Sequence, residues 1–247
     1  MKNVLLLAMS TLGRETKDNF YLWDGTIYVG QSQLEPITHM LSDERKKNGE
    51  KLDKIIILET KATLKAEEGE KSAVEFYKER AGLFLDKNVE YVDIGIDENR
   101  PAEGIARATG IILHDYEEER DKDGRMNLWI DTQGGFRDVV MVFNAIISLL
   151  GKQGIKPAGI YSIRYESGNT RENPCRIIDQ TKNYNIFEFV SAMQEFMNYG
   201  KAGGLKKYYG EEDAFVQAVS GIADAIQMCQ TQKFGDAIRK FAYYLKS

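Results

Sequence analysis

Residues Asn127–Leu150, NLWIDTQGGFRDVVMVFNAIISLL, decide how the rest of the chain is interpreted. The apolar run Leu128–Ile130 predicts a strand, Asp131–Gly135 predicts a turn, and a strongly amphipathic helix is expected over Phe136–Leu150. Free backbone N–H groups and the dipole at a helix N-terminus favour an anion, and glycine lets that anion approach the backbone closely. Arg137 adds a positive charge in the first helical turn. The stretch therefore predicts a device that holds phosphate.

Composition narrows the possible functions. The chain has 247 residues, 43% of them hydrophobic, which suffices for one α/β domain with a smaller appendage. The 33 basic and 38 acidic residues give a net charge of −5, which argues against broad binding of long nucleic acid but allows a small polyanion in a locally positive pocket. Cys175 and Cys229 form neither a disulfide framework nor a metal-ligand pattern, so we expect a cytoplasmic location.

The sequence indicates no membrane partner. No stretch approaches the roughly 20 apolar residues that cross a bilayer. The apolar run Val4–Met9 is too short for a signal peptide and continues directly into a glycine-containing turn. We interpret it as the first buried strand.

Hydrophobic periodicity predicts an α/β fold, with a Rossmann-like, mostly parallel sheet and helices on both faces, over residues 1–180. Strands are expected at Val4–Met9, Phe20–Trp23, Thr26–Val29, Lys54–Leu58, Val89–Ile94, Leu128–Ile130 and Gly159–Arg164, and helices at Gln33–Leu41, Ser72–Leu85, Ala102–Glu118 and Phe136–Leu150. Asp24-Gly25 is typical of a two-residue hairpin turn.

The pattern changes after about Thr170. Arg171–Asp179 is polar, and helices are expected at Ile186–Tyr199, Ala214–Gln230 and Phe234–Leu245, with a break at Lys201–Gly204. Residues 181–247 are therefore predicted to form a C-terminal α-helical appendage.

Four loops are candidates for a binding site. Ligands of open α/β sheets bind beyond the carboxyl ends of the parallel strands, near a topological switch point. Ser10–Arg14, Glu59–Thr63, Thr132–Arg137 and Tyr165–Asn169 would gather at that edge. Their hydroxyls, amides, glycines and cations suit phosphate and ribose better than an apolar substrate.

Simpler interpretations of these residues remain open. Gly134-Gly135 can be only a tight connection, Arg137 an ordinary surface arginine, and Ser10 and Thr11 caps of a turn. The chain contains no Walker motif, and no G-x-G-x-x-G follows the first strand, which disfavours ATPase and ordinary dinucleotide functions.

Catalytic and metal-binding patterns are sparse. His39 and His114 are the two histidines, too few for nucleophilic triads or zinc sites, so we expect no catalytic set, no metal and no cofactor. Arg107 and His114 have an R-x6-H spacing that resembles the pair of HEPN ribonucleases, but this spacing falls inside the α/β region instead of a helical bundle.

Three segments of the chain form a pattern when they are taken together. The first is LLLAMSTLG with the tyrosine-containing hairpin FYLWDGTIYVG. The second is IDTQGGFRDVVMVFNAIISLL, and the third is GIYSIRYE followed by NPCRIIDQTKNYNIFEFVSAMQEFMNYGKA. Together they resemble the CRISPR-associated Rossmann fold (CARF) proteins of type III CRISPR systems, and the likeness spans nearly all of the chain. The second segment is similar to the family's Asp-Thr-(His/Gln)-Gly-Phe-Arg signature, but Gln133 stands where histidine is common, a glycine is added before Phe136, and Val139-Val140 replace an expected proline.

The resemblance implies a homodimer that binds a cyclic oligoadenylate across its two-fold axis, as a sensor in antiviral defence that allosterically controls an effector. Family frequency favours cyclic tetra-adenylate. Such proteins often continue into an effector, frequently a HEPN ribonuclease, and none is recognisable here. Two interpretations stay open: a sensor fragment whose effector domain is missing from this chain, or a complete protein with a minimal helical tail. Residues 181–247 would be a helical connector or dimerisation region.

The resemblance also assigns candidate ligand-binding residues. Those after the first strand would contact phosphate or ribose, those of the mid-chain turn would hold ring phosphates, and two further loops would contact adenine or ribose. In that order they are Ser10, Thr11 and Gly13; Gln133, Gly134, Gly135 and Arg137; and Thr60, Tyr165 and Ser167.

Two other functions remain open. The chain could be a ring nuclease that cleaves the messenger in the same pocket without metal, by attack of a 2′-hydroxyl on its adjacent phosphate. It could also be an unrelated Rossmann-like nucleotide-binding protein.

Overall fold

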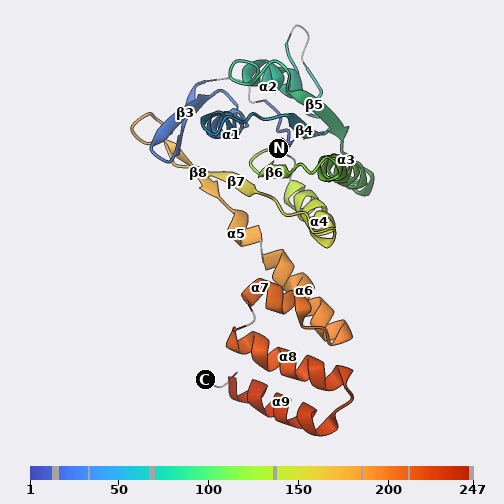
Figure 1. Cartoon of the computed structure of the whole chain (residues 1–247). Coiled ribbons are helices and arrows are strands. Elements are labelled where there is room, and N and C mark those ends of the chain that lie inside the picture. The colour runs from blue at the N-terminus through green and yellow to red at the C-terminus, as the bar shows by residue number, and fades with distance from the viewer. Residues whose placement is uncertain are drawn as a thin grey trace. The chain divides into compact units, whose positions relative to one another are not determined.

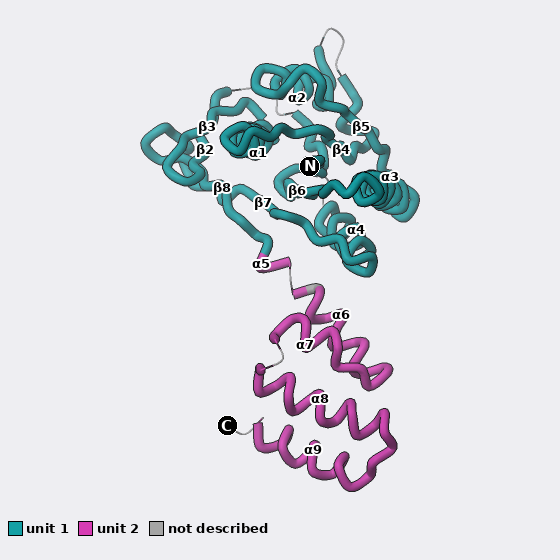
Figure 2. Tube along the Cα trace, in the orientation of Figure 1, with its two compact units in different colours: residues 1–181 teal, residues 182–247 magenta. Residues whose placement is uncertain are grey.

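The computed structural model of the chain describes residues 1–12, 17–32, 34–66, 70–135, 138–184, 186–210 and 212–244 (Figure 1). The chain divides into two compact units, residues 1–181 and residues 182–247 (Figure 2). None of the described helices combines the length and the apolarity that a bilayer crossing requires.

Unit 1 is built on one sheet, and its described strands follow the order β3-β2-β8-β7-β6-β1-β4-β5. Neighbouring strands are parallel except in the β2–β3 and β7–β8 pairs, so the predicted Rossmann-like α/β fold is confirmed. The strands are β1 (Lys2–Ala8), β2 (Asn19–Trp23), β3 (Thr26–Gly30), β4 (Lys54–Glu59), β5 (Glu90–Gly95), β6 (Met126–Asp131), β7 (Gly159–Arg164) and β8 (Cys175–Asp179).

Both faces of the central strands are covered by helices. In β1 the side chains of Leu5 and Leu7 pack into one core with α1 (Glu35–Lys47) and α2 (Ala73–Ala81). The alternate side chain of Leu6 is also fully buried, because α3 (Ala102–Asp121) and α4 (Val139–Lys152) cover the opposite face (Figure 1). Burial on both sides explains the continuous apolar runs of these parallel strands.

Strand order places a topological switch point between β1 and β6. Along the chain, β4 is added beside β1 and β5 beside β4. The chain then returns through α3, so that β6 pairs with the opposite edge of β1 and β7 follows outside it. The loops after β1 and β6 therefore diverge at one place, where ligands of such sheets bind.

Several elements of unit 1 differ from the sequence-based expectation. α4 begins at Val139 instead of Phe136. β8 forms within the segment that was expected to be only polar, because Cys175 and Ile177 are buried there on either side of the exposed Arg176. α1 continues to Lys47 through a polar stretch that has no apolar repeat. α2 ends at Ala81 instead of Leu85, although Ser72 and Glu75 form the capping box that fixes its start.

Unit 2 consists of helices around a small core. They are α5 (Thr181–Tyr184), whose first residue belongs to unit 1, α6 (Ile186–Tyr199), α7 (Gly203–Tyr209), α8 (Ala214–Gln227) and α9 (Thr231–Tyr244). α7 was not expected, because its glycines indicated a break. At Gly204 an added Cβ would lie 2.8 Å from the Cβ of Ala192, so this glycine lets α7 approach α6 closely.

Candidate functional site

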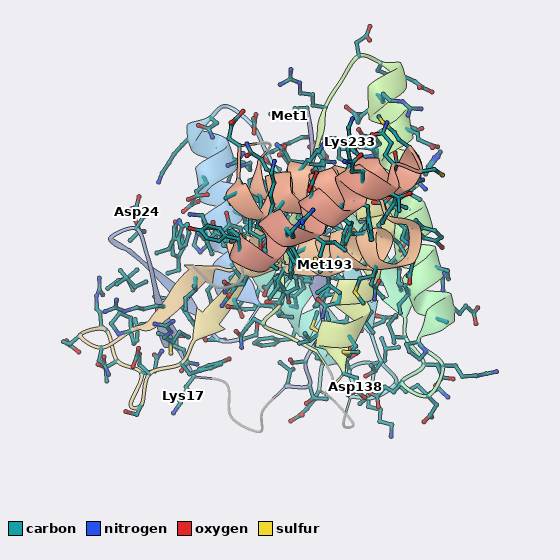
Figure 3. The ribbon with its side chains drawn as sticks, turned by 90° about the horizontal axis from the view of Figure 1, so that it is seen from below. Met1, Lys17, Asp24, Asp138, Met193 and Lys233 are labelled. Carbon is teal, nitrogen blue, oxygen red and sulfur yellow. The ribbon has the colours of Figure 1, made fainter. Side chains whose placement is uncertain are left out.

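The loops after β1 and β6 are joined directly at the switch point. Leu7 and Asp131 are register partners at the carboxyl ends of the two strands. Just beyond them, the backbone N–H of Gly135 donates to Oγ of Ser10 at 2.9 Å. Figure 3 shows Asp138, which precedes α4, at one edge of unit 1, and Met1, which precedes β1, at the opposite edge. The structure thus brings together two of the loops that the sequence singled out.

The glycine pair of the turn packs against the end of β1. A Cβ on Gly134 would lie 2.0 Å from the carbonyl oxygen of Ala8, and Gly135 has a φ of +111°, in the region that favours glycine. A Cβ on Gly135 would also lie 2.9 Å from Cβ of Val139. Both positions therefore require glycine for the turn to sit this close to the strand. The glycine pair therefore does form a tight connection after the strand, and this connection lies at the switch point.

Gln133 fastens the turn to β7 through its side-chain amide. Nε2 donates to the hydroxyl of Tyr165 at 2.8 Å, and Oε1 accepts from the backbone N–H of Ile163 at 2.7 Å. Beside it, the N–H and the hydroxyl of Thr132 both donate to the carbonyl oxygen of Tyr161, each at 2.9 Å. The predicted residues Gln133 and Tyr165 are therefore in direct contact, and burial raises the pKa of Tyr165 to about 12.

Asp131 lies beneath this turn and was not selected from the sequence. It is fully buried, and Oδ1 accepts from the backbone N–H of Gln133 at 2.8 Å. Oδ2 has no hydrogen-bond partner among the described residues. Burial raises the pKa of Asp131 to about 8, so the carboxyl is mostly neutral at pH 7. A polar residue at the end of an otherwise apolar strand was the available signal, but its burial depends on the packed neighbours.

α4 presents its N-terminus at the same turn. Its N-cap residue is Asp138, whose side chain accepts no hydrogen bond from the described part of the first helical turn. α1 also begins at this edge, but a carboxylate is already present there. The side chain of Glu35 accepts hydrogen bonds from the N–H groups of Gln31 and Ser32 and from Nε of Arg80. The N-terminal end of α4 is therefore the better place for an added anion.

The loop after β4 satisfies its own polar groups. Thr60 donates its N–H to Oγ1 of Thr63, whose hydroxyl donates back to the carbonyl of Thr60. Thr60 is 5% exposed, and burial raises the pKa of the neighbouring Glu59. The structure places Thr60 at the predicted edge but turned inward.

The loop after β7 is held in place while its side chains stay accessible. Asn169 exchanges two hydrogen bonds with the backbone of Phe20, both 2.8 Å, and the carbonyl of Ser167 accepts from Asn173. Tyr165 is 52% exposed and Ser167 is exposed. Thr11, beyond β1, is exposed as well.

The remaining predicted residues fall elsewhere. Gly13 and Arg137 lie outside the described residues. Arg107 and His114 line a groove with Lys54 and Glu90, the first residues of β4 and β5, at the amino ends of the strands. The structure does not bring this pair to the switch point. Among the described residues, no three His, Cys, Asp or Glu side chains are grouped so that they could hold a metal ion.

No family model matches the chain, and no curated protein matches it. The chain is similar to Csm6 of Enterococcus italicus, solved bound to cyclic hexa-2′-fluoro-hexa-dAMP, with 9% sequence identity and a TM-score of 0.45. The match covers 93% of this chain and 56% of the Csm6 chain, so this chain spans just over half of that protein's length.

Proposed function

We propose that this chain is the ligand-binding part of a cyclic-oligoadenylate sensor and that two copies hold one ring. The observation that carries the proposal is the 2.9 Å hydrogen bond from the Gly135 N–H to Ser10 Oγ, which unites the β1 and β6 loops at the switch point. These loops also contain the segments that resemble CARF proteins. Position in the sheet and sequence pattern thus favour the same site.

The chemistry at this edge suits phosphate. The hydroxyls of Ser10 and Thr11 can donate to phosphate oxygens, and the start of α4 has no side-chain cap from Asp138 among the described residues. Arg137 follows the turn in sequence and would supply a charge-assisted bond. A ring with several phosphates needs more than one such edge, which is the reason to expect two copies.

α4 offers the surface for that second copy. Val140, Met141 and Leu149 are 48%, 69% and 41% exposed, which leaves large apolar side chains on a helix that starts beside the glycine turn. A symmetric pairing through α4 would bring the two turns to one two-fold axis, as a symmetric ligand requires.

Tyr165 is the candidate platform for adenine. Its ring is half-exposed, and its hydroxyl is fixed by Gln133. Stacking of a base on an aromatic ring contributes about 1–3 kcal/mol per base and orients the base without reading its edge. Ser167, two residues further, lies in the same loop for a ribose contact.

Thermal unfolding with a panel of nucleotides tests the function. The protein is mixed with cyclic tetra-adenylate, cyclic hexa-adenylate, linear tetra-adenylate, NAD or ATP. A true ligand stabilises through mass action, by about 2.7 kcal/mol at a hundredfold excess over its Kd. We expect strong stabilisation by a cyclic oligoadenylate alone, with one ring per two chains by light scattering. Stabilisation only by NAD or ATP would instead favour an unrelated nucleotide-binding protein.

The same mixtures separate sensing from cleavage. Labelled cyclic tetra-adenylate is incubated with the protein without metal, and the products are resolved. An intact ring supports the sensor, whereas linear products with a 2′,3′-cyclic phosphate would make the chain a ring nuclease.

A further inference from the structure

Asp131 combines a position at the centre of the site with an unusual polar environment. It is the last residue of β6, with Leu7 of β1 and Tyr161 of β7 as its register partners on either side. Its backbone therefore lies between two neighbouring strands, and the side chain is fully buried. One carboxyl oxygen accepts from the N–H of Gln133, while the other has no partner among the described residues.

We propose that Asp131 is a positioning residue that holds the β6 turn as a neutral carboxylic acid, and that loss of its proton loosens the turn and weakens binding of an anion there. The part that concerns the ligand rests on the proposed function. The part that concerns the turn does not.

The hydrogen bonds give Asp131 its influence over the site. Its Oδ1 fixes the backbone of Gln133, and the side chain of Gln133 in turn bonds to Ile163 and Tyr165. Ionisation would leave a buried charge that, in the described part of the chain, a single N–H group compensates, and a buried charge without a partner is costly. Movement that lets water reach Asp131 would therefore disturb the bonds that Gln133 makes.

Among the described residues, the ionisable groups around Asp131 supply no compensating charge. Tyr77 of α2, Tyr161 of β7 and Tyr165 lie around it, and burial holds the pKa of Tyr161 and Tyr165 at about 12 and that of Tyr77 well above its ordinary value. Glu35 of α1 faces Tyr77, and its charge is met by Arg80. Cys175 and Tyr21 also face Tyr165, and burial raises the pKa of Tyr21 well above its ordinary value.

Binding of a polyanion beside Asp131 then involves proton uptake. Negative phosphates disfavour the carboxylate and so raise its proton affinity, and by linkage the proton raises the affinity for the phosphates. With the pKa of Asp131 at about 8, affinity is highest below pH 7 and falls as the pH rises through 8 to 9.5. We expect a loss on the order of fivefold to tenfold, within the range of typical site couplings.

The turn is tested in the protein without ligand. The amide resonance of Gln133 is followed by NMR from pH 6 to 9.5 in the wild type, in Asp131→Asn and in Cys175→Ala. We expect a shift with its midpoint near pH 8 that Asp131→Asn abolishes and Cys175→Ala retains. An amide that does not titrate in the wild type overturns the proposal. So does a titration that Cys175→Ala removes, and both results are available even if Asp131→Asn does not fold.

The ligand is tested by calorimetry with cyclic tetra-adenylate at pH 8, in two buffers of different ionisation enthalpy. We expect net proton uptake by the wild type and none by Asp131→Asn. Equal proton uptake in both proteins would overturn the coupling. Absence of binding by both at pH 7 and at pH 9 would instead refute the proposed function, and the amide titration would still decide the role of Asp131 in the turn.

Discussion

The hydroxyl of Ser10 accepts a hydrogen bond from the backbone N–H of Gly135 across a separation of 125 positions in the chain. This bond joins the ends of two adjacent parallel strands at the point where the strand order reverses. It fixes the spacing between the two loops that a phosphate would have to contact together. The bond is therefore the first feature to test by mutation.

Removal of the Ser10 hydroxyl leaves the Gly135 N–H without its partner. We expect Ser10→Ala to lower the free energy of unfolding by about 0.5–1.5 kcal/mol, the net contribution of a typical hydrogen bond, because this bond is only partly buried. Urea unfolding measures it. Ser32→Ala is the matched control, because the Ser32 hydroxyl has no hydrogen-bond partner among the described residues. Equal losses in the two variants would show that the Ser10 bond does not hold the turn.

Substitution of Gly134 tests whether the turn must lie against β1. The new Cβ of Gly134→Ala would meet the Ala8 carbonyl oxygen at 2.0 Å, which backbone movement alone can relieve. We expect a loss of stability of about 1–3 kcal/mol, as for other overpacked sites. Gly110→Ala in α3 is the control, since nothing lies within 4 Å of its Cβ position, and it should stabilise by about 0.5–1 kcal/mol. A neutral Gly134→Ala would contradict the close approach.

The framework of the site could be predicted from the sequence because its signals are local. The KIIIL run predicted β4, and the Asp24-Gly25 pair predicted a hairpin in which both residues do have positive φ, 44° and 75°. Known rules for parallel sheets then placed the loops after β1 and β6 at one edge. These inferences need only periodicity, turn chemistry and topology.

The interior of the site could not be predicted because it depends on residues far apart in sequence. Gln133 bonds to Tyr165 across 32 positions, and no local pattern specifies that pairing. Asp131 reads as an ordinary polar residue at a strand end, and its burial follows only from β1 and β7 on either side. β8 was missed for a further reason. Its alternation of buried and exposed residues is short, and charged residues interrupt it.

Arg137 follows the glycine turn in sequence and is expected to bind a ring phosphate. We predict that Arg137→Ala weakens binding of cyclic tetra-adenylate by about 1.5–3 kcal/mol, the usual contribution of a hydrogen bond to a charged group. Calorimetric titration gives the affinity. Arg120→Ala removes an exposed arginine at the far end of α3 and should leave the affinity unchanged. Identical affinity of Arg137→Ala and wild type would remove this arginine from the site.

The exposed side of α4 predicts the oligomeric state. A glutamate in the centre of a symmetric apolar interface introduces two like charges, so Met141→Glu should convert a dimer into monomers and abolish ring binding. Leu83→Glu is a matched control, because Leu83 is 71% exposed against 69% for Met141 and lies just beyond α2. Light scattering reports the mass of each protein. A Met141→Glu variant that remains dimeric would place the interface elsewhere.

The buried carboxyl of Asp131 predicts how stability depends on pH. Its pKa rises from about 4 in the unfolded chain to about 8 in the folded protein, so the folded state binds the proton more tightly. Stability from this group is therefore complete below about pH 4, declines as the pH rises toward 8, and is level above that. Asp131→Asn cannot ionise but keeps an oxygen that can accept from Gln133. Urea unfolding at pH 5, 6.5, 8 and 9 gives the free energy of unfolding of both proteins. The difference between them, variant minus wild type, should increase up to pH 8 and stay constant above it. If the free energies of unfolding of the two proteins instead changed with pH in parallel, Asp131 would already be ionised in the folded state. Its buried carboxylate would then need a compensating partner, which contradicts the prediction.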